Sequence, residues 1–539
     1  MLLRALCFAA LTCATFGLAS TGMSADERPN IVLIYTDDQD LDEIGCYGGK
    51  MPTPHMDGLA RDGMKFTRYY VCSAVCAPSR YNVLSGRCAS RSSRQQGRKY
   101  PPGGPVNIGW EAGIVGEPHN VARVLQSAGY ATGMVGKWHQ GQLGRIVNFD
   151  ESARPDDPAV VRQLAENYDE VIRSIKSCGF DYAAAAYQNN VDGATAGKPH
   201  WLPRALGRHN MEWVAAAALE FLEAKHDRPF FLYMAPTLVH SPSAVKSLQS
   251  DPRTTPLGYI DIRDVMPSRE SVMERARAVG AKNPGLLDKA AGSIWLDDGV
   301  GAILDKLDAL GLRENTLVIL ASDNGNVAKF SCYDGGARLP MVARWPGVVP
   351  AGAVCDELVT NLDFAPTFFA AAGASIPGDM ILDGRDITAA LIGDPSYERS
   401  SLFLEITTER AVVTEDGFKY IAVRYLPEVQ KLVDLGRKFN HWCQPMEAAT
   451  HTYNADQRYP FYFDQDQLYD LRNDPSELEN LYDRTRQAGR IERMRQLIRE
   501  YSSRLPHTFG EFTEQRPSSG EKQAAPGVEI DSSRRRLYY

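Results

Sequence analysis

The sequence has little of several features that mark special classes of protein. It has no excess of basic residues, since 59 Lys and Arg stand against 67 Asp and Glu and give a net charge of −8. This balance argues against nucleic acid as a partner, although a local cationic pocket could still bind an anion. The cysteines are widely spaced and lack the paired C-x-x-C clusters of a structural zinc site. No internal repeat is visible, so nothing favours a repeat architecture. The apolar run at residues 5–18 is too short to span a membrane comfortably.

That apolar run is typical of a secretory signal peptide. It follows a positive charge at Arg4 and leads into small residues through Ala25, so we expect residues 1–25 to be a signal peptide. A membrane anchor is the alternative. The pattern predicts export to a periplasmic, secreted or lysosome-like compartment, with no stable membrane span after cleavage. Export permits disulfides among the cysteines beyond Cys7 and Cys13, but the sequence does not fix their pairing.

Four apolar stretches flanked by helical patterns predict buried strands at residues 30–35, 130–135, 229–235 and 316–321. They end in polar side chains, which are Asp37, Asp38, Lys137, His139, His240, Asp323, Asn324 and Lys329. In an α/β layout the exits of such strands can gather at one edge of the sheet, so we expect these side chains to converge. The pattern predicts a large α/β domain over residues 28–395, with helices at 118–128, 211–225, 293–310 and 360–373.

Two polar segments, residues 140–210 and 245–290, are expected to be loops, the second with short helices. The first segment contains four candidates for contacting a substrate, with plain solvated surface as the alternative: Arg145, His200, Arg204 and His209. Short strands linked by turns predict a smaller α+β domain with an antiparallel sheet over residues 396–514, closed by a helix at 485–504. Residues 515–539 are polar and predict a disordered tail.

The stretch from Cys76 to Arg80, with the sequence C-A-P-S-R, combines a thiol with the start of a helix. Pro78 suits the first turn, which would put free N–H groups and the positive end of the helix beside Cys76. Arg80 lies four residues further on and can share this anion site. The stretch therefore predicts a nucleophile in an anion pocket. The alternatives are a structural thiol or a half-cystine paired with Cys72.

Asp37 and Asp38 directly follow the first predicted strand. Carboxylate oxygens suit calcium or magnesium rather than zinc, so the pair indicates a hard-cation site, with a solvated turn as the alternative. The histidines and lysines at the other strand ends are individually uninformative, because a loop histidine is usually held by local hydrogen bonds and a loop lysine is usually solvated. Their convergence carries more information than any single residue.

The pattern C-x-P-S-R followed by L-S-G-R resembles the signature of the type I sulfatase family, in the alkaline-phosphatase-like superfamily. Other segments resemble family motifs in the family's order, at residues 37–38, 136–139, 240–242, 322–325, 329, 333–338 and 468–475. The resemblance covers about residues 28–485. It implies a large mixed, mostly parallel sheet flanked by helices, with a smaller C-terminal α+β domain. One departure is Asp334, at a position where Glu is common.

In that family the motif cysteine is oxidised to formylglycine. The resemblance therefore implies a partner that matures Cys76, either a formylglycine-generating enzyme or another sulfatase-maturing enzyme. It assigns the ligands of one calcium ion as Asp37, Asp38, Asp323, Asn324 and the modified Cys76. It assigns sulfate binding to Arg80, Lys137 and Lys329. His139 would act on the formylglycine hydroxyls, and His240 would serve near the leaving oxygen.

The implied activity is hydrolysis of sulfuric esters. A calcium-bound formylglycine hydrate would attack sulfur, form a covalent sulfo-enzyme, and release inorganic sulfate from a sulfated carbohydrate or a small sulfate ester. One alternative is a phosphoesterase of the same superfamily, but such enzymes usually use Ser or Thr with a second metal site. The other is a non-catalytic secreted sulfoglycan-binding protein, which would have no need of His139.

Overall fold

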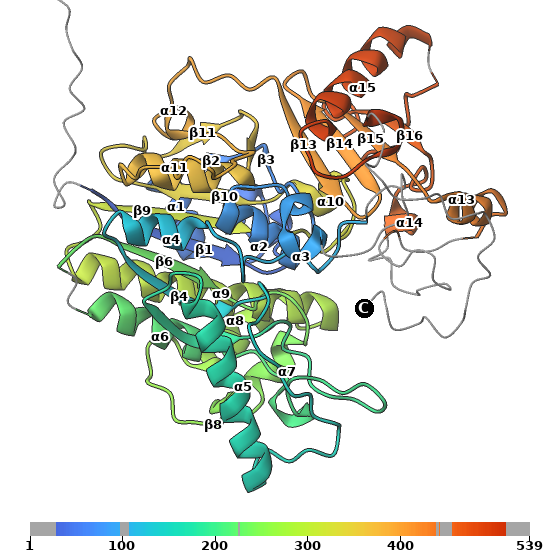
Figure 1. Ribbon diagram of the computed structural model, residues 1–539. Helices are drawn as coiled ribbons and strands as arrows, with labels where there is room; N and C mark the ends of the chain where they lie inside the picture. Colours follow the sequence, from blue (N-terminus) through green and yellow to red (C-terminus); the bar gives the residue numbers. More distant parts are fainter. Residues whose placement is uncertain are drawn as a thin grey trace, which may run out of the picture.

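A computed structural model gives the architecture of residues 28–96, 107–224, 227–437, 441, 455–483 and 485–513 (Figure 1). The predicted signal peptide, the predicted tail and Cys443 lie outside these described residues. Among the described helices, none has both the length and the apolar character needed to cross a membrane.

An eight-stranded sheet forms the centre of the molecule, in the order β11-β2-β10-β9-β1-β6-β4-β5. Its strands are β1 (Asn30–Thr36), β2 (Met64–Phe66), β4 (Ala131–Lys137), β5 (Tyr182–Tyr187), β6 (Phe230–Ala235), β9 (Thr316–Ser322), β10 (Met341–Arg344) and β11 (Ala353–Cys355). β1 pairs in parallel with β6 and β9, and β4 pairs in parallel with β5 and β6. β10 runs antiparallel to β2 and β9. The predicted mixed, mostly parallel sheet is confirmed.

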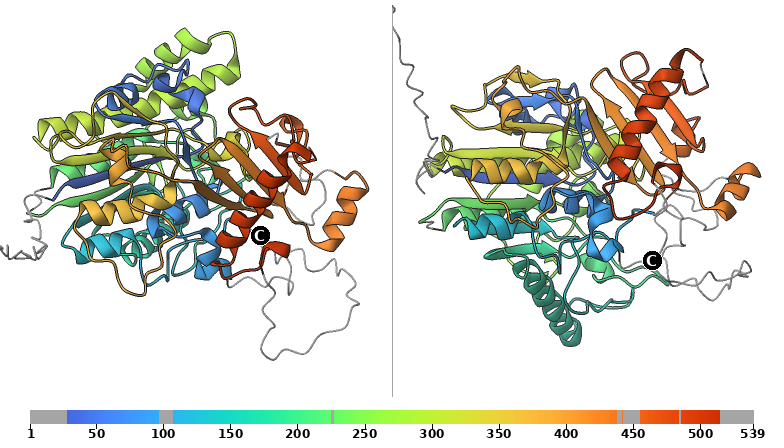
Figure 2. Two further views of the ribbon diagram at one scale, coloured as in Figure 1. Left: turned by 90° about the horizontal axis from the view of Figure 1, so that it is seen from above. Right: turned by 45° about the horizontal axis from the view of Figure 1, so that its top comes forward.

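Helices cover both faces of this sheet (Figures 1 and 2). The helices of this part of the chain are α1 (Pro54–Arg61), α2 (Cys76–Ser85), α3 (Ser93–Gln96), α4 (Val121–Ser127), α5 (Pro158–Lys176), α6 (Met211–Glu223), α7 (Ala244–Leu248), α8 (Arg269–Gly280), α9 (Pro284–Ala309), α10 (Asp334–Ala337), α11 (Phe364–Ala371) and α12 (Thr388–Leu391). Successive side chains of a strand point to opposite faces of the sheet, so β1 contributes side chains to two hydrophobic cores. Ile31 and Leu33 pack in one core with α2, α4 and α11, whereas Val32 and Ile34 pack in another with α1, α6 and α9.

The prediction of loops between residues 140 and 210 was wrong, because this segment contains α5 and β5. Helix α5 begins at Pro158, and the side chain of Asp157 accepts a hydrogen bond from the backbone N–H of Ala159. This start signal is visible in the sequence. β5 has the sequence Y-A-A-A-A-Y, and alanine is a poor strand former. This segment therefore forms a strand because it pairs with β4. Helix α9 also begins earlier than residue 293, at Pro284 after the N-cap Asn283.

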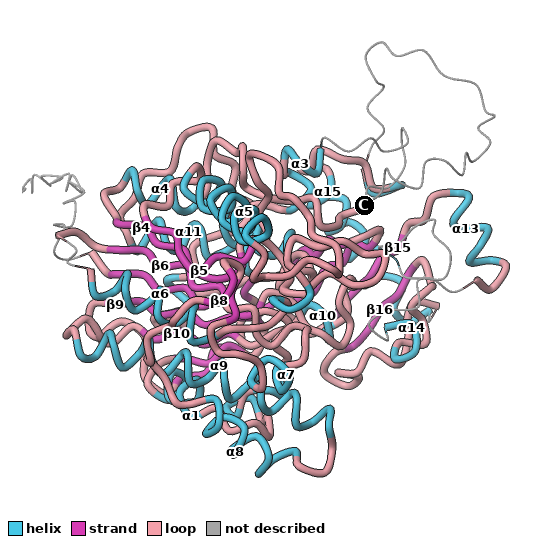
Figure 3. Tube along the Cα trace, turned by 90° about the horizontal axis from the view of Figure 1, so that it is seen from below, coloured by secondary structure: helices cyan, strands magenta, loops and turns pink. Residues whose placement is uncertain are grey.

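A second sheet lies beside the first, toward the C-terminus of the chain (Figures 1 and 3). Its antiparallel strands are β13 (Ser401–Ile406), β14 (Glu409–Thr414), β15 (Phe418–Val423) and β16 (Asp466–Asp470). Three further helices are α13 (Pro427–Asp434), α14 (Ala455–Arg458) and α15 (Ala488–Ser502). Short pairs elsewhere join β3 (Tyr69–Tyr70) to β12 (Val359–Thr360) and β7 (Thr254–Thr255) to β8 (Gly258–Tyr259). The predicted C-terminal antiparallel sheet is confirmed.

A buried ion cluster joins the C-terminal sheet to helix α10 of the larger domain. Lys419 on β15 is fully buried and its Nζ contacts Asp334 on α10 and lies 2.9 Å from Glu477 Oε1. The same Nζ donates to the backbone carbonyl of Cys332 at 3.0 Å. Asp334, one of the positions where the sequence departs from the family pattern, therefore has a buried ion-pair partner in Lys419.

We expect Lys419→Met to destabilise the protein by about 3–5 kcal/mol, because it leaves buried carboxylates without a cation. The free energy of unfolding in urea measures the change. The matched control is Lys306→Met, since Lys306 pairs with Glu223 at 2.7 Å on the surface and such pairs contribute about 0–1 kcal/mol. Equal losses in the two variants would contradict a special role for the buried cluster.

Candidate functional site

The ends of four parallel strands meet at one edge of the central sheet, as predicted. Asp37 and Asp38 follow β1, Lys137 ends β4, His240 lies beyond β6, and Asp323 and Asn324 follow β9. Asp38 and Asp323 are joined across this edge, since the backbone N–H of Asp38 donates to Asp323 Oδ1 at 3.1 Å. Asp38 also adopts a left-handed conformation with φ of 60°, which is uncommon for a residue other than glycine and is typical of a functional position.

Cys76 is the first residue of helix α2, and every residue of that helix is buried. Its Sγ lies 3.5 Å from Asp37 Oδ1. Burial raises the pKa of the Cys76 thiol to about 12. An unmodified Cys76 would therefore be protonated at neutral pH and a poor nucleophile. The seven described cysteines are all free, and Cys72 lies beside Cys88, so the alternative of a Cys72–Cys76 half-cystine is wrong in this structure.

Arg80 lies one helical turn after Cys76 and points into the same centre. Its Nη2 is 2.7 Å from Asp323 Oδ2 and 3.7 Å from Asp37 Oδ1. The closer contact is an ion pair without hydrogen-bond geometry, because neither of its two atoms has a hydrogen-bond partner among the described residues. Arg80 is fully buried. Its guanidinium therefore keeps donors that an anion could engage.

The two candidate lysines are buried, which excludes the alternative of a solvated surface. Lys137 Nζ lies 2.6 Å from Asp37 Oδ2 and 2.7 Å from Asn190 Oδ1. Lys329 Nζ lies 2.6 Å from Asp38 Oδ1. Burial alone would raise the pKa of each aspartate, but Lys137 holds the pKa of Asp37 well below its usual range and Lys329 lowers that of Asp38.

Asn190 is a site residue that the sequence reasoning missed. It follows β5, which was expected to be a loop, so its place at a fifth strand exit could not be recognised. Recognising Y-A-A-A-A-Y as a strand would have placed Gln188, Asn189 and Asn190 at the same sheet edge as Lys137.

The two candidate histidines approach the centre from different loops. The backbone N–H of His139 donates to Gln188 O at 2.9 Å, and its φ of 49° is left-handed. Burial, followed by the charges of Lys137 and Arg80, holds the pKa of His139 well below its usual value. His240 Nε2 lies 3.7 Å from Asp38 Oδ2, and burial also lowers the pKa of His240. Both imidazoles are therefore neutral at pH 7 in this structure.

His209 was predicted as a candidate substrate contact, and the structure gives it another role. It is buried, and its Nε2 lies 2.8 Å from the carbonyl oxygen of His240 and 2.9 Å from that of Pro242. Its Nδ1 lies 2.8 Å from Thr237 Oγ1. Through these contacts His209 fixes the position of the loop that carries His240.

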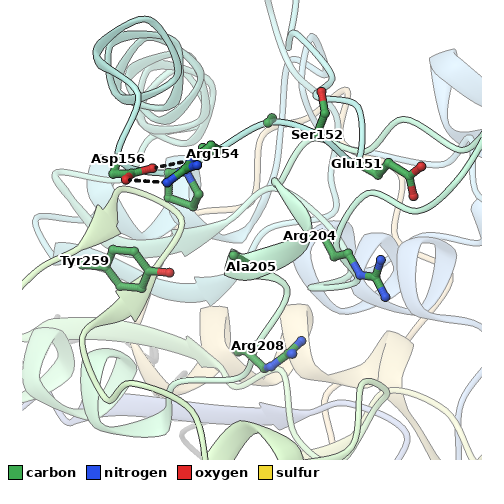
Figure 4. Close-up of a pocket in the computed structure, with 10 residues that line it drawn as sticks. Glu151, Ser152, Arg154, Asp156, Arg204, Ala205, Arg208 and Tyr259 are labelled. Carbon is green, nitrogen blue, oxygen red and sulfur yellow. Dashed lines mark hydrogen bonds and ion pairs between the residues drawn. The ribbon is translucent and has the colours of Figure 1, made fainter.

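The other three candidate contacts lie away from this centre or at its rim. Arg204 is exposed and lines a surface pocket of about 570 Å³ with Arg208 and Tyr259, where Arg154 pairs with Asp156 (Figure 4). Arg145 is exposed, and His200 lines a smaller hollow of about 280 Å³ that also includes Gln188. Because the backbone of Gln188 holds His139, this hollow lies next to the centre. A role for these residues in substrate binding stays a prediction.

The residues of the centre fit a hard divalent cation. Asp37, Asp38, Cys76 and His240 each offer a possible ligand atom within a 4.8 Å cluster. Asn324 Oδ1 is buried and lacks a hydrogen-bond partner among the described residues, although Asn324 Nδ2 contacts Asp38 at 2.6 Å. Carboxylate and amide oxygens are typical calcium ligands. Burial raises the pKa of Asp323 to about 7, and a bound cation would favour its charged form.

Comparisons with known proteins identify related sequences and folds. The family model described as Sulfatase matches residues 29–374, and the model described as N-sulphoglucosamine sulphohydrolase, C-terminal, matches residues 323–440. Human arylsulfatase A is 32% identical over 411 residues, which are 71% of this chain and 72% of that protein.

Solved structures also resemble the fold, two of them as follows. One is a Bacteroides thetaiotaomicron sulfatase structure (BT33336S-sulf) from work on glycosaminoglycan metabolism, with a TM-score of 0.60, 21% identity, and coverage of 88% of this chain and 99% of that chain. The other is BT4656 in complex with its substrate D-glucosamine-2-N,6-O-disulfate, with a TM-score of 0.58, 20% identity, and coverage of 89% and 98%.

Proposed function

The chain belongs to the sulfatase family, in the alkaline-phosphatase-like superfamily, and from this premise we propose that it releases inorganic sulfate from a sulfated carbohydrate at Cys76. It is a sulfuric ester hydrolase. The finer proposal is that Cys76 is matured to formylglycine and that one Ca²⁺ is held beside it by Asp37, Asp38, Asp323 and Asn324.

The observation that carries the proposal is the balance of buried charge around Cys76. Three carboxylates face three cations, which are Asp37, Asp38 and Asp323 against Arg80, Lys137 and Lys329. These charges cancel, so a divalent cation would leave the centre with two surplus positive charges. A buried centre of that charge favours an anion such as a sulfate ester.

A bound calcium ion and a formylglycine at residue 76 would supply chemistry that unmodified side chains lack. Calcium would supply the charge that ionises a hydroxyl and polarises sulfate. Hydrated formylglycine would supply two hydroxyls on one carbon, one to attack sulfur and one to let sulfate leave.

The chain's own residues would bind the sulfate and move protons. Arg80, Lys137 and Lys329 would hold the sulfate oxygens and stabilise the charge that develops on them. Neutral His139 would accept a proton from a hydroxyl at residue 76. His240, protonated once a bound sulfate ester raises its pKa, would donate a proton to the leaving oxygen, with Lys329 close by.

The similar proteins support a sulfated sugar as substrate, since BT4656 binds a disulfated glucosamine as its substrate. The test is sulfate release from a panel of sulfated mono- and oligosaccharides, with an aryl sulfate and matched phosphate esters as further arms. We expect sulfate release from at least one sugar sulfate. Turnover of the phosphate esters alone would favour the phosphoesterase, and sugar binding without any release would favour the sulfoglycan-binding protein.

Export and maturation are part of the same proposal. The signal peptide expected at residues 1–25 would direct the chain out of the cytosol, and a formylglycine-generating or other maturing enzyme would act on the Cys76 motif. The boundary between a catalytic domain at 28–395 and a C-terminal subdomain at 396–514 also remains a prediction.

We expect His209→Ala to lower kcat for sulfate release by about 10–100-fold, because a displacement of about 1 Å in a catalytic group can cost that much. The change removes three side-chain contacts to the loop that carries His240, while leaving the residues proposed to hold calcium in place. The measurements are kcat, KM and bound calcium. His200→Ala is the matched control, and we expect it to change KM more than kcat. A His209→Ala enzyme with normal kcat would contradict the positioning role.

A further inference from the structure

A second cluster of metal-ligating side chains lies outside the catalytic centre. Cys72 follows β3, Cys88 follows α2, and Glu405 lies on β13 of the C-terminal sheet. Each residue offers one ligand atom, and the three atoms lie within 4.8 Å of one another. All three residues are buried, with 1%, 3% and 0% of their surface exposed. The proposed sulfatase mechanism uses none of them.

One carboxylate oxygen in this cluster lacks a hydrogen-bond donor within the part of the chain that the structure describes. Glu405 Oε1 accepts from the backbone N–H of Ser90 at 2.8 Å. Glu405 Oε2 is buried and has no hydrogen-bond partner among the described residues. The nearest cation is Arg410, whose Nε lies 3.9 Å away, beyond hydrogen-bond distance. A buried carboxylate oxygen left in this way is unfavourable unless another partner binds it.

The distance between the sulfurs matches a shared metal ion. Cys72 Sγ lies 3.9 Å from Cys88 Sγ. Two thiolates on tetrahedral zinc, with Zn–S bonds of about 2.3 Å, would lie about 3.8 Å apart. A disulfide would require the sulfurs to approach to about 2.05 Å. We propose that Cys72, Cys88 and Glu405 form a zinc site, distinct from the hard-cation centre at Asp37 and Asp38.

The charges of the proposed site balance. Binding Zn²⁺ would release the thiol protons of Cys72 and Cys88 to solvent and leave two thiolates. With the Glu405 carboxylate they carry three negative charges, which Zn²⁺ and the neighbouring Arg410 neutralise. Sulfur ligands select zinc over calcium, so the two centres would bind different metals.

Backbone hydrogen bonds hold each of the three proposed ligands in position. The backbone N–H of Glu405 donates to Cys72 O at 2.8 Å, and that of Cys72 donates to Asn361 Oδ1 at 2.9 Å. The backbone N–H of Cys88 donates to Asp383 Oδ2 at 2.8 Å. Such outer contacts are what an ordered metal site requires.

The cluster also has an approach from one side. A cavity of about 250 Å³ borders Cys88, and Arg91 and Asp383 are among the residues that line it. This cavity offers an entry path for a metal ion on the side of Cys88. A bound zinc would tie β13 to both ends of the segment that contains α2. Its expected role is therefore to stabilise the position of the Cys76 helix.

The test uses the full chain purified without chelator. We expect close to one zinc per chain by elemental analysis. Replacing the metal with Co²⁺ should give the thiolate charge-transfer and tetrahedral d–d absorption bands of a sulfur-ligated site. Cys72→Ser, Cys88→Ser and Glu405→Gln should each weaken zinc affinity at least about tenfold. Cys178→Ser is the matched control, because Cys178 is buried outside the cluster, and it should keep the bands.

Three results would overturn the proposal. They are a Cys72–Cys88 disulfide in peptides mapped without reduction, two free thiols in protein that takes up no zinc, and cobalt–thiolate bands that survive in both cysteine variants. The wild-type metal content and spectrum decide the question even if a variant fails to fold. Sulfate release and calcium content are measured in parallel. They test the proposed function, whereas zinc content and the cobalt spectrum test the zinc site, so the failure of one proposal can be told from the failure of the other.

Discussion

Cys76→Ser should abolish turnover, with kcat for sulfate release lowered by about 10⁴–10⁶-fold. A serine at this position offers one hydroxyl, which could attack sulfur but leaves no second hydroxyl on the same carbon to let sulfate depart. The substitution is nearly isosteric in a fully buried helix, so a loss of this size cannot be assigned to packing. Steady-state and single-turnover sulfate release measure the effect.

The matched control is Cys355→Ser, another buried cysteine, on β11 at the edge of the sheet. We expect it to keep near-normal kcat. Near-normal turnover in Cys76→Ser would contradict the role of residue 76. A loss of equal size in both variants would point to damaged folding instead.

Asp323→Ala should remove most of the bound calcium and lower sulfate release by at least about 10³-fold, because electrostatic stabilisation at a reacting centre is typically worth that much for a single donor. Asp323 is fully buried, and its carboxylate contacts both the Asp38 backbone and Arg80. Its removal would take away a proposed calcium ligand and leave Arg80 with an excess of positive charge.

Calcium content and thermal stability test this without relying on activity. Calcium at 100 times its Kd should stabilise the wild-type protein by about 2.7 kcal/mol, and this stabilisation should disappear in Asp323→Ala. Asp323→Asn, which keeps the shape, separates loss of charge from loss of packing. Asp42→Ala is the matched control, because Asp42 follows β1 but is exposed and pairs with Lys289. Unchanged calcium content in Asp323→Ala would remove that residue from the ligand set.

The parts of the fold and site that could be predicted from the sequence are those determined by residues close together in the chain. β1 is a continuous apolar run buried along its whole length, and its chemistry follows immediately at Asp37 and Asp38. The other strand exits could be brought to the same edge because parallel strands end on one side of a sheet. Cys76 at a helix start follows from Pro78 and needs no knowledge of distant residues.

The parts that the sequence did not predict depend on contacts between distant residues. β5 is alanine-rich and becomes a strand only by pairing with β4, so Asn190 was missed with it. His209 reads locally as a polar loop residue, whereas its partners lie about thirty residues away, at Thr237, His240 and Pro242. Cys72, Cys88 and Glu405 lie far apart in the sequence, and no short spacing motif links them.

The most direct test of the central claim is peptide mass spectrometry of residue 76, using protein that releases sulfate from a sulfate ester. We predict that this peptide carries an aldehyde at position 76, detected as the mass decrease expected when the thiol is replaced by a carbonyl oxygen and by reaction with a carbonyl probe. Cys178 and Cys355, in the same digest, should remain as cysteine. Fully active protein in which residue 76 is only unmodified cysteine would contradict the claim.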